Sequence, residues 1–174
     1  LTVGLIPRSL GPSNFGNFTF LNLFFNRLFQ LMDFNVSNAF FTKFSKRQSE
    51  KKLLSFRLLF FIISGFIIVL ISLFVVKSEY KELILPAQNQ IIIYAVLIYT
   101  LLNALLLIVR NVNDILGFTS KFELLVIIQT IFFSVSILSS FYLNQLNINS
   151  YIIISCLSFL FIIISGTILF IKKS

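Results

Sequence analysis

The chain of 174 residues contains no histidine and no tryptophan, and it has only one cysteine and one methionine. Without histidine and with a single cysteine, it lacks the ligands for bis-histidine haem, a Cys/His zinc site or a copper centre. The same absence excludes Ser-His-Asp and Cys-His catalytic arrangements, and the sequence has no glycine-rich phosphate loop. Cys156 has no intrachain disulfide partner, so its expected role is that of a small packing residue. We therefore expect no catalytic residue, no cofactor and no metal site in this chain.

Charge is missing from four long apolar runs, at residues 58–76, 91–109, 124–143 and 151–171, each 19 to 21 residues long. A helix rises 1.5 Å per residue, so about 20 apolar residues cross the roughly 30 Å hydrocarbon core of a bilayer. Apolar residues make up 57% of the chain, and its mean hydropathy is +0.98. A water-soluble core does not absorb four such segments, since its helices need a polar face. The sequence predicts an all-α polytopic membrane protein with four transmembrane helices.

The predicted organisation has two parts, with residues 58–174 forming the transmembrane domain and residues 1–57 preceding it. Pro7, Gly11 and Pro12 lie among the first fifteen residues, so we expect an extended or turning arm there. Residues 35–50 read as a polar, flexible connector. The first residue is leucine, which leaves open a non-AUG start or a processed end.

An amphipathic helix is predicted between these segments, at residues 18–34. Asn22, Asn26, Gln30 and Asp33 recur at helical spacing and form one polar stripe. The opposite side carries the apolar residues Phe18, Leu21, Phe25, Leu28 and Met32. We expect this helix at the membrane interface or on a neighbouring subunit. A fifth span is disfavoured because Arg27 at its centre would cost about 2.5 to 3.5 kcal/mol to insert.

The net charge of +8 is concentrated just before the first run. Basic residues at a helix flank are retained on the cytoplasmic or matrix side and attract anionic lipids such as cardiolipin. Four spans place both termini on the same side of the membrane. Ten basic residues flank the runs on that side and two on the other, which predicts that both termini face the matrix, or the cytoplasm of a bacterium. This interpretation is favoured over nucleic-acid binding. The candidate lipid-contacting or topology-determining residues are Lys43, Lys46, Arg47, Lys51, Lys52 and Arg57.

Small and polar residues inside the runs are candidates for helix packing. Gly65 and Gly166 would let helix backbones approach one another. Asn103 in the second run and Gln129 in the third, with several serines and threonines, have two interpretations: hydrogen bonds between helices, or the lining of a hydrated path. We favour the first, because a conducting path normally includes an ionisable group.

The Leu1 start, the bias toward Phe (23 residues), Ile, Leu and Asn, and the short apolar runs together resemble divergent mitochondrially encoded proteins of ciliate-type protists. The resemblance covers the whole chain and is one of composition, without a diagnostic motif. It implies a non-catalytic subunit of a mitochondrial inner-membrane respiratory-chain complex, with complex I first and complex IV second. The implied partners are other membrane subunits, and the chain is expected to have no small-molecule substrate of its own. Two alternatives stay open: a membrane subunit of mitochondrial ATP synthase, and a small bacterial transporter component.

Overall fold

The computed structural model describes residues 2–47, 50–79, 81–85 and 88–171, and within these ranges the chain forms eight helices and no strand. Four of them are long and apolar enough to cross a membrane: α4 (Lys51–Lys77), α6 (Gln90–Ile115), α7 (Thr119–Tyr142) and α8 (Ile148–Ile171). This confirms the predicted all-α membrane fold. Each helix is longer than its charge-free run, because the helix continues into the polar flank. Predictions that involve Leu1, Lys172 and Lys173 fall outside the described residues.

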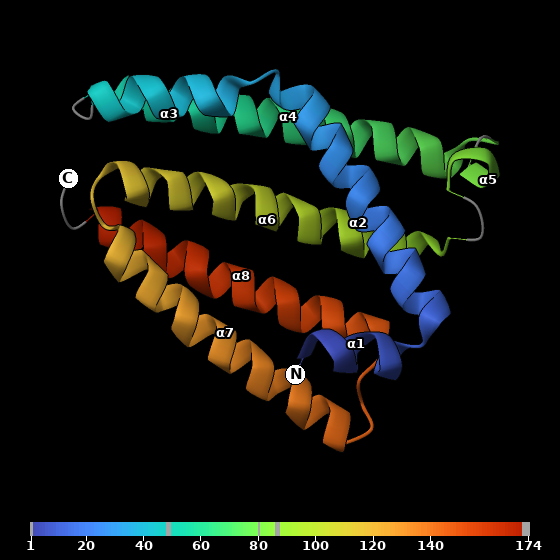
Figure 1. Cartoon of the computed structure of the whole chain (residues 1–174). Coiled ribbons are helices and arrows are strands. Elements are labelled where there is room, and N and C mark those ends of the chain that lie inside the picture. Colours follow the sequence, from blue (N-terminus) through green and yellow to red (C-terminus); the bar gives the residue numbers. More distant parts are fainter. Residues whose placement is uncertain (1, 48–49, 80, 86–87, 172–174) are drawn as a thin grey trace.

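Helix α6 lies at the centre of the arrangement (Figure 1). It packs most extensively against α8, and it also contacts α2, α4 and α7. The short connector between α7 and α8 places these helices side by side. Helix α7 lies at the outer edge and makes much less contact with α6 than α8 does.

The turn between α6 and α7 covers residues 116–118 and is much shorter than the gap at residues 110–123 between the second and third charge-free runs, which reads as a loop in the sequence. Helix α6 continues to Ile115 because Val112, Asn113 and Ile115 are all buried against neighbouring helices. Only Gly117 supplies the turn conformation, with a φ of 78° that favours glycine. The burial of a polar asparagine could not be inferred from local composition.

The first fifteen residues are helical, which corrects the predicted extended arm. Helix α1 covers Thr2–Leu10, and helix α2 covers Pro12–Asp33. Gly11 separates them with a φ of 78°, and Pro12 starts α2, a position where a missing N–H costs little. Ile6 and Leu10 bury against the bundle, and this packing favours helix α1 despite its internal proline.

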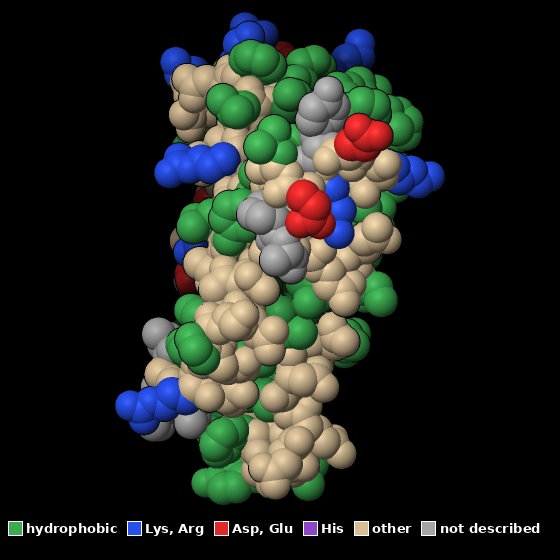
Figure 2. All heavy atoms as spheres, turned by 90° about the vertical axis from the view of Figure 1, so that its right-hand side faces the viewer, with side chains coloured by type: hydrophobic (Ala, Val, Ile, Leu, Met, Phe, Trp, Pro, Cys, Tyr) green, Lys and Arg blue, Asp and Glu red, His purple; other side chains and the backbone are tan. Residues whose placement is uncertain are grey.

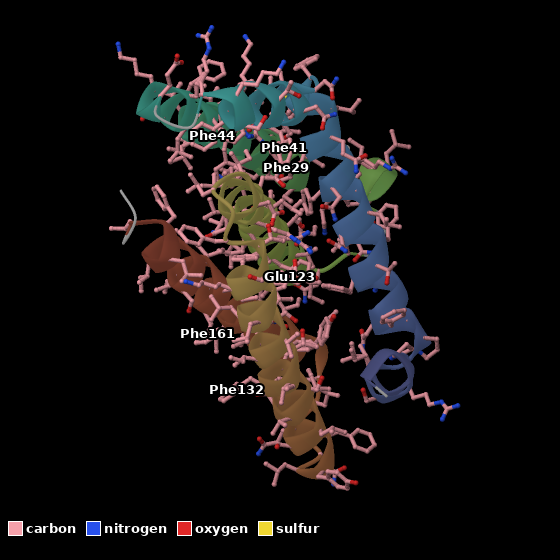
Figure 3. The ribbon with its side chains drawn as sticks, turned by 60° about the vertical axis from the view of Figure 1, so that its left-hand side comes forward. Phe29, Phe41, Phe44, Glu123, Phe132 and Phe161 are labelled. Carbon is pink, nitrogen blue, oxygen red and sulfur yellow. The ribbon has the colours of Figure 1, made fainter. Side chains whose placement is uncertain are left out.

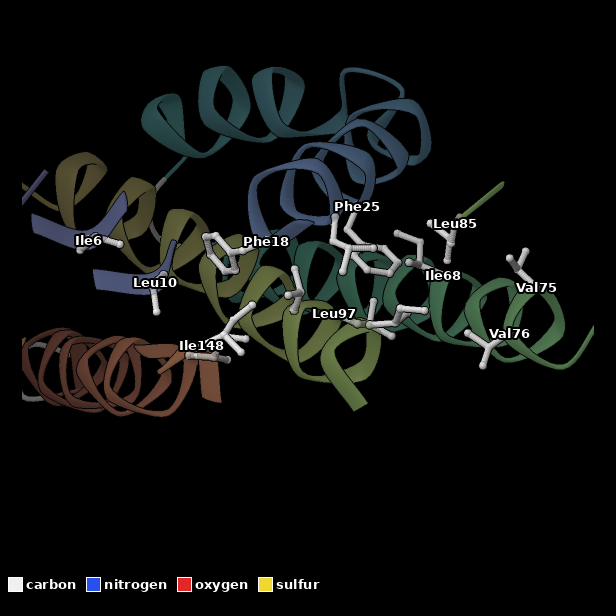
Figure 4. Close-up of a cluster of buried hydrophobic side chains, with 14 of the residues drawn as sticks. Ile6, Leu10, Phe18, Phe25, Ile68, Val75, Val76, Leu85, Leu97 and Ile148 are labelled. Carbon is white, nitrogen blue, oxygen red and sulfur yellow. The ribbon is translucent and has the colours of Figure 1, made fainter. Parts of the chain in front are cut away.

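Helix α2 contains the predicted amphipathic segment, and its apolar face packs against the chain's own helices. Phe18, Leu21 and Phe25 are buried in one cluster with residues of α1, α4, α6 and α8, part of which is shown in Figure 4. This replaces the expected contact of these residues with lipid or a partner subunit. Phe20, Leu23 and Leu31 are exposed on α2, so the helix presents apolar side chains outward as well.

Helix α2 runs obliquely across the bundle and connects its two ends (Figure 1). Near its start, the Gln88 side-chain amide donates to Asn17 Oδ1 at 3.0 Å, just before α6 begins. At its last residue, Asp33 pairs with Arg57 near the start of α4. With 22 residues, α2 is about 33 Å long. Helix α1 packs beside α7, away from the end of the bundle where the lysines of α3 lie.

The predicted flexible connector at residues 35–50 is also largely helical. Helix α3 (Val36–Lys46) buries Phe40 and Phe44, one turn apart, against Val112 and Ile115 of α6. Most polar residues of α3 are exposed, while Ser37 at its start is half-buried, and the two aromatic residues anchor the helix. Helices α2 and α3 both pack over α4 and α6, whereas α1 packs against α2 and α7. The remaining helix, α5 (Lys81–Ile84), is one turn long and precedes α6.

Candidate functional site

The six basic residues proposed as lipid contacts occupy two different environments. Lys43 and Lys46 lie in the last turns of α3, and their side chains are exposed. Arg47 follows them and pairs with Glu50 at 3.2 Å on the surface, while Lys52 is exposed in the first turn of α4. The side chain of Lys51 lies outside the described part. Figure 2 shows the opposite end of the bundle, near α5, where acidic and basic side chains are interspersed.

Arg57 differs from the others because its side chain turns inward and is only 10% exposed. Its Nη1 lies 3.2 Å from Asp33 Oδ1, and its Nη2 donates a hydrogen bond to Ser37 Oγ at 2.6 Å. The guanidinium carbon also lies 5.8 Å from the centre of the Phe60 ring. A guanidinium is favoured in such a partly buried ion pair because it binds oxygen acceptors in a fixed fork geometry.

The turn between α2 and α3 holds Asp33 in place. Phe34 and Asn35 adopt left-handed backbone conformations with φ of 42° and 63°, and the chain bends between the two helices there (Figure 1). Asp33 then accepts hydrogen bonds from the Ser37 backbone N–H at 3.1 Å and from its hydroxyl at 2.8 Å. A carboxylate that accepts from the first turn of a helix stabilises that N-terminus. Asp33, Ser37 and Arg57 thus link α2, α3 and α4 in one polar network.

This network lines a cavity of about 360 Å³ where α2, α4 and α6 meet, which we call the junction cavity. Polar groups gather near the ion pair, and the other walls are apolar. The polar side chains are Asn26, Gln30, Asp33, Asn35, Ser37, Arg57, Ser64 and Asn111. The apolar ones are Phe29, Phe61, Ala104, Leu107 and Ile108. Of the residues named from sequence, only Arg57 and members of the polar stripe of α2 meet here.

Gly166, a candidate from the sequence, lies at a point of close approach between helices. A Cβ atom at this position would lie 2.7 Å from Phe122 Cε2 of α7 and 2.8 Å from Val109 Cγ1 of α6. Gly65 is less crowded, since its nearest neighbour would be Leu101 Cδ2 at 3.1 Å. Both glycines are buried, but only Gly166 has two neighbouring helices packed against its backbone.

A buried hydrogen bond between α6 and α8 comes from Asn113 rather than from Asn103. The fully buried Asn113 side-chain amide donates to Val109 O at 2.9 Å and to Gly166 O of α8 at 3.2 Å. Asn103 lies half-buried on α6. Sequence reasoning missed Asn113 because it was assigned to a loop, where asparagine is common.

The polar residues of α7 have different roles. Thr130, Ser136 and Ser139 donate to carbonyls of their own helix four residues earlier, so these hydroxyls are satisfied without a second helix. Gln129 is half-buried and lines two neighbouring spaces between α7 and α8. One is a mainly apolar groove of about 380 Å³, in which Phe132 and Phe161 lie on the same side of the helix pair (Figure 3). The other, of about 180 Å³, is lined by Gln129 with Tyr99 of α6 and Tyr151 of α8.

Comparison with known proteins gives no relative: no family model, no curated protein and no solved structure matches this chain. Within the described ranges, no three His, Cys, Asp or Glu side chains gather into a metal-binding group. The arrangement therefore offers binding and packing chemistry: a buried ion pair in a polar cavity, an apolar groove, and closely packed helices.

Proposed function

We propose that this chain is a non-catalytic membrane subunit of a mitochondrial respiratory-chain complex, with complex I first and complex IV second. In this proposal it acts as a scaffold, and neighbouring subunits carry the redox and proton chemistry. Its basic end, with Lys43 and Lys46, faces the matrix, where the excess of positive flanking charge favours retention. The compositional resemblance to protist mitochondrial proteins supports the compartment.

The observation that carries the proposal is the exposure of α7. Only Phe122 and Ile137 of its 24 residues are buried. Its exposed side chains include Ile131 and Phe132, at 60% and 76%. Beside them, the groove contains Gln129 and polar serines, which a surface meeting only hydrocarbon does not need. A span that touches its own chain so little, with polar groups at membrane depth, fits a helix that packs against another subunit.

Native separation of detergent-solubilised mitochondrial membranes, with mass spectrometry of each fraction, tests the assignment. The chain is expected to comigrate with the subunits of complex I or complex IV. Comigration with the F1 subunits of ATP synthase would reject the respiratory assignment, and migration as a free small protein would reject a subunit role altogether.

Paired variants test whether α7 forms the interface. Replacing Ile131 and Phe132 with alanine is expected to weaken comigration, because interface contacts depend on well-packed large side chains. The matched control replaces Ile62 and Phe66 of α4, which are 66% and 63% exposed and lie on a face without polar groove residues. This control is expected to leave comigration unchanged. Equal loss in both double variants would contradict a specific role of α7.

A further inference from the structure

The junction cavity lies at the boundary between two charge-free runs and their polar flanks. The charge-free run of α4 begins immediately after Arg57, and the run of α6 ends at Val109, two residues before Asn111. Arg57 and Asn111 line the polar part of the cavity, whereas Phe61 and Ala104 line it further inside the runs. The cavity lining therefore changes from polar to apolar in the same order as a lipid molecule does, from its headgroup to its glycerol and acyl chains.

The charges in the cavity come as a pair of opposite sign. Arg57 supplies a guanidinium that is nine-tenths buried, and Asp33, 24% exposed, supplies a carboxylate 3.2 Å away. A ligand with a single negative charge would gain little net attraction from this neutral pair. A ligand that carries both a phosphate and a cationic amine matches both members, since the phosphate complements Arg57 and the amine complements Asp33.

The amine must also donate hydrogen bonds. Asp33 already accepts from Ser37 and Arg57, and a carboxylate has about four lone-pair positions. A primary ammonium donates to such an acceptor, whereas a trimethylammonium has no N–H. The exposed side chains of Gln30, Asn35 and Leu107 lie among the lining residues, so the cavity is open to its surroundings. Its volume of about 360 Å³ lies within the range of small-ligand sites.

We propose that the junction cavity binds the headgroup of a phosphatidylethanolamine molecule, with its phosphate against Arg57 and its ammonium against Asp33. The apolar walls formed by Phe61 and Leu107 then contact the glycerol and the first carbons of an acyl chain. This site differs from the exposed lysines of α3, which attract anionic lipid without a cavity. The proposal does not depend on which complex contains the chain.

Native mass spectrometry of the delipidated full-length chain in detergent provides the first test. Phosphatidylethanolamine, phosphatidylcholine and phosphatidylglycerol with identical acyl chains are titrated separately. We expect ethanolamine lipid to bind about tenfold more tightly than choline lipid, the ratio that one charge-assisted hydrogen bond supplies. Affinity should fall stepwise through the mono- and dimethylated ethanolamine lipids, and soluble phosphoethanolamine should compete only weakly because it lacks the apolar part. Equal binding of all the lipids, or preference for phosphatidylglycerol, would overturn the proposal. Soluble phosphoethanolamine that competes as strongly as the whole lipid would also overturn it, because the site would then bind a free phosphate compound rather than a lipid.

Two variants separate this site from a merely structural ion pair. Asp33→Asn leaves the Arg57 charge without its carboxylate, and we expect the preference to switch from ethanolamine lipid to phosphatidylglycerol. Replacing Lys43 and Lys46 with glutamine should lower phosphatidylglycerol binding and leave the ethanolamine preference unchanged. Unchanged selectivity in Asp33→Asn would overturn the proposal. If that variant does not fold, the methylation series on the unmodified chain decides the question alone.

Filling the cavity without changing charge gives an independent test. Ala104→Phe places a ring against Leu107 and Phe61 and should abolish the ethanolamine preference. The matched control, Ala39→Phe on the exposed face of α3, should retain it. Retention of the preference in Ala104→Phe would place the lipid outside the junction cavity and overturn the assignment.

Discussion

Replacing Gly166 with alanine is expected to separate α8 from its neighbours. The added Cβ would lie 2.7 Å from Phe122 Cε2 and 2.8 Å from Val109 Cγ1, closer than carbon atoms approach without displacement. Phe122 is fully buried and Val109 is 8% exposed, so a shift of either side chain disturbs the packing around it. The displacement would also strain the hydrogen bond from Asn113 to Gly166 O.

The matched variant Gly65→Ala isolates the cost of this overlap. Both substitutions gain helix propensity, about 1 kcal/mol in soluble hosts, and this gain cancels in the comparison. At Gly65 the nearest atom is the tip of the Leu101 side chain at 3.1 Å, which has rotamers available. Overpacking of a rigid site costs about 1 to 3 kcal/mol. We therefore expect Gly166→Ala to melt roughly 4 to 8 °C below Gly65→Ala, corresponding to about 2 kcal/mol.

The single cysteine of the chain provides the assay. Cys156 lies half-buried on α8, so its reaction with a thiol-specific fluorophore during heating reports the separation of this helix. In a Phe122→Leu background, Gly166→Ala should lower the melting temperature by a smaller amount, because the ring atoms that the added Cβ would meet are gone. If Gly166→Ala melts at or above the temperature of Gly65→Ala, the close contact of α6, α7 and α8 at this glycine is refuted.

Three further predictions address individual features. Asn113→Ala should destabilise the chain by about 0.6 to 1.7 kcal/mol, the range for hydrogen bonds between membrane helices. Asn103→Ala should have a smaller effect in the same melting assay, and equal effects would contradict the role of Asn113. Glu123→Gln removes a surface ion pair with Arg110 of α6. This substitution should lower the stability of the chain by less than about 1 kcal/mol, and the loss should disappear at high salt. A loss that persists at high salt would show a different role. For orientation, Ser45→Cys and Gln145→Cys in a Cys156→Ser background place thiols at opposite ends of the bundle. A membrane-impermeant maleimide added to intact, right-side-out mitoplasts should label only the cysteine at position 145, and labelling of position 45 would reverse the proposed topology.

The four spans were predictable because hydrophobic length is a local property. Each charge-free run lies within a single helix, except that Leu143 follows the last residue of α7, and the errors are confined to the helix ends. The run at residues 58–76, for example, is extended back to Lys51 in α4. The end of a helix depends on whether its flank has something to pack against, and the buried Val112 and Ile115 show why α6 continues beyond its run.

The N-terminal segment was harder to predict because its helices depend on distant contacts. Phe40 and Phe44 gave a one-turn spacing in the sequence, but their burial site on α6 is more than sixty residues away. Likewise, the polar stripe of α2 predicted an amphipathic helix without indicating its partner. The buried face meets the chain's own spans, and Asp33 at the end of the stripe meets Arg57. A pattern of residues gives the faces of a helix, whereas its position depends on complementary surfaces elsewhere.

By itself, the sequence determined that this is a membrane protein, how many candidate spans it has, and that it contains no histidine for a bis-histidine haem site. These follow from composition and from the length of apolar runs, which the bilayer thickness makes decisive. Only the tertiary structure decided that α2 crosses the bundle, that Asn113 joins α6 to α8, and that Arg57 is buried beside Asp33 in a cavity. Those features require residues far apart in the chain to meet at atomic distances, and such meetings are set by the packing of the whole molecule.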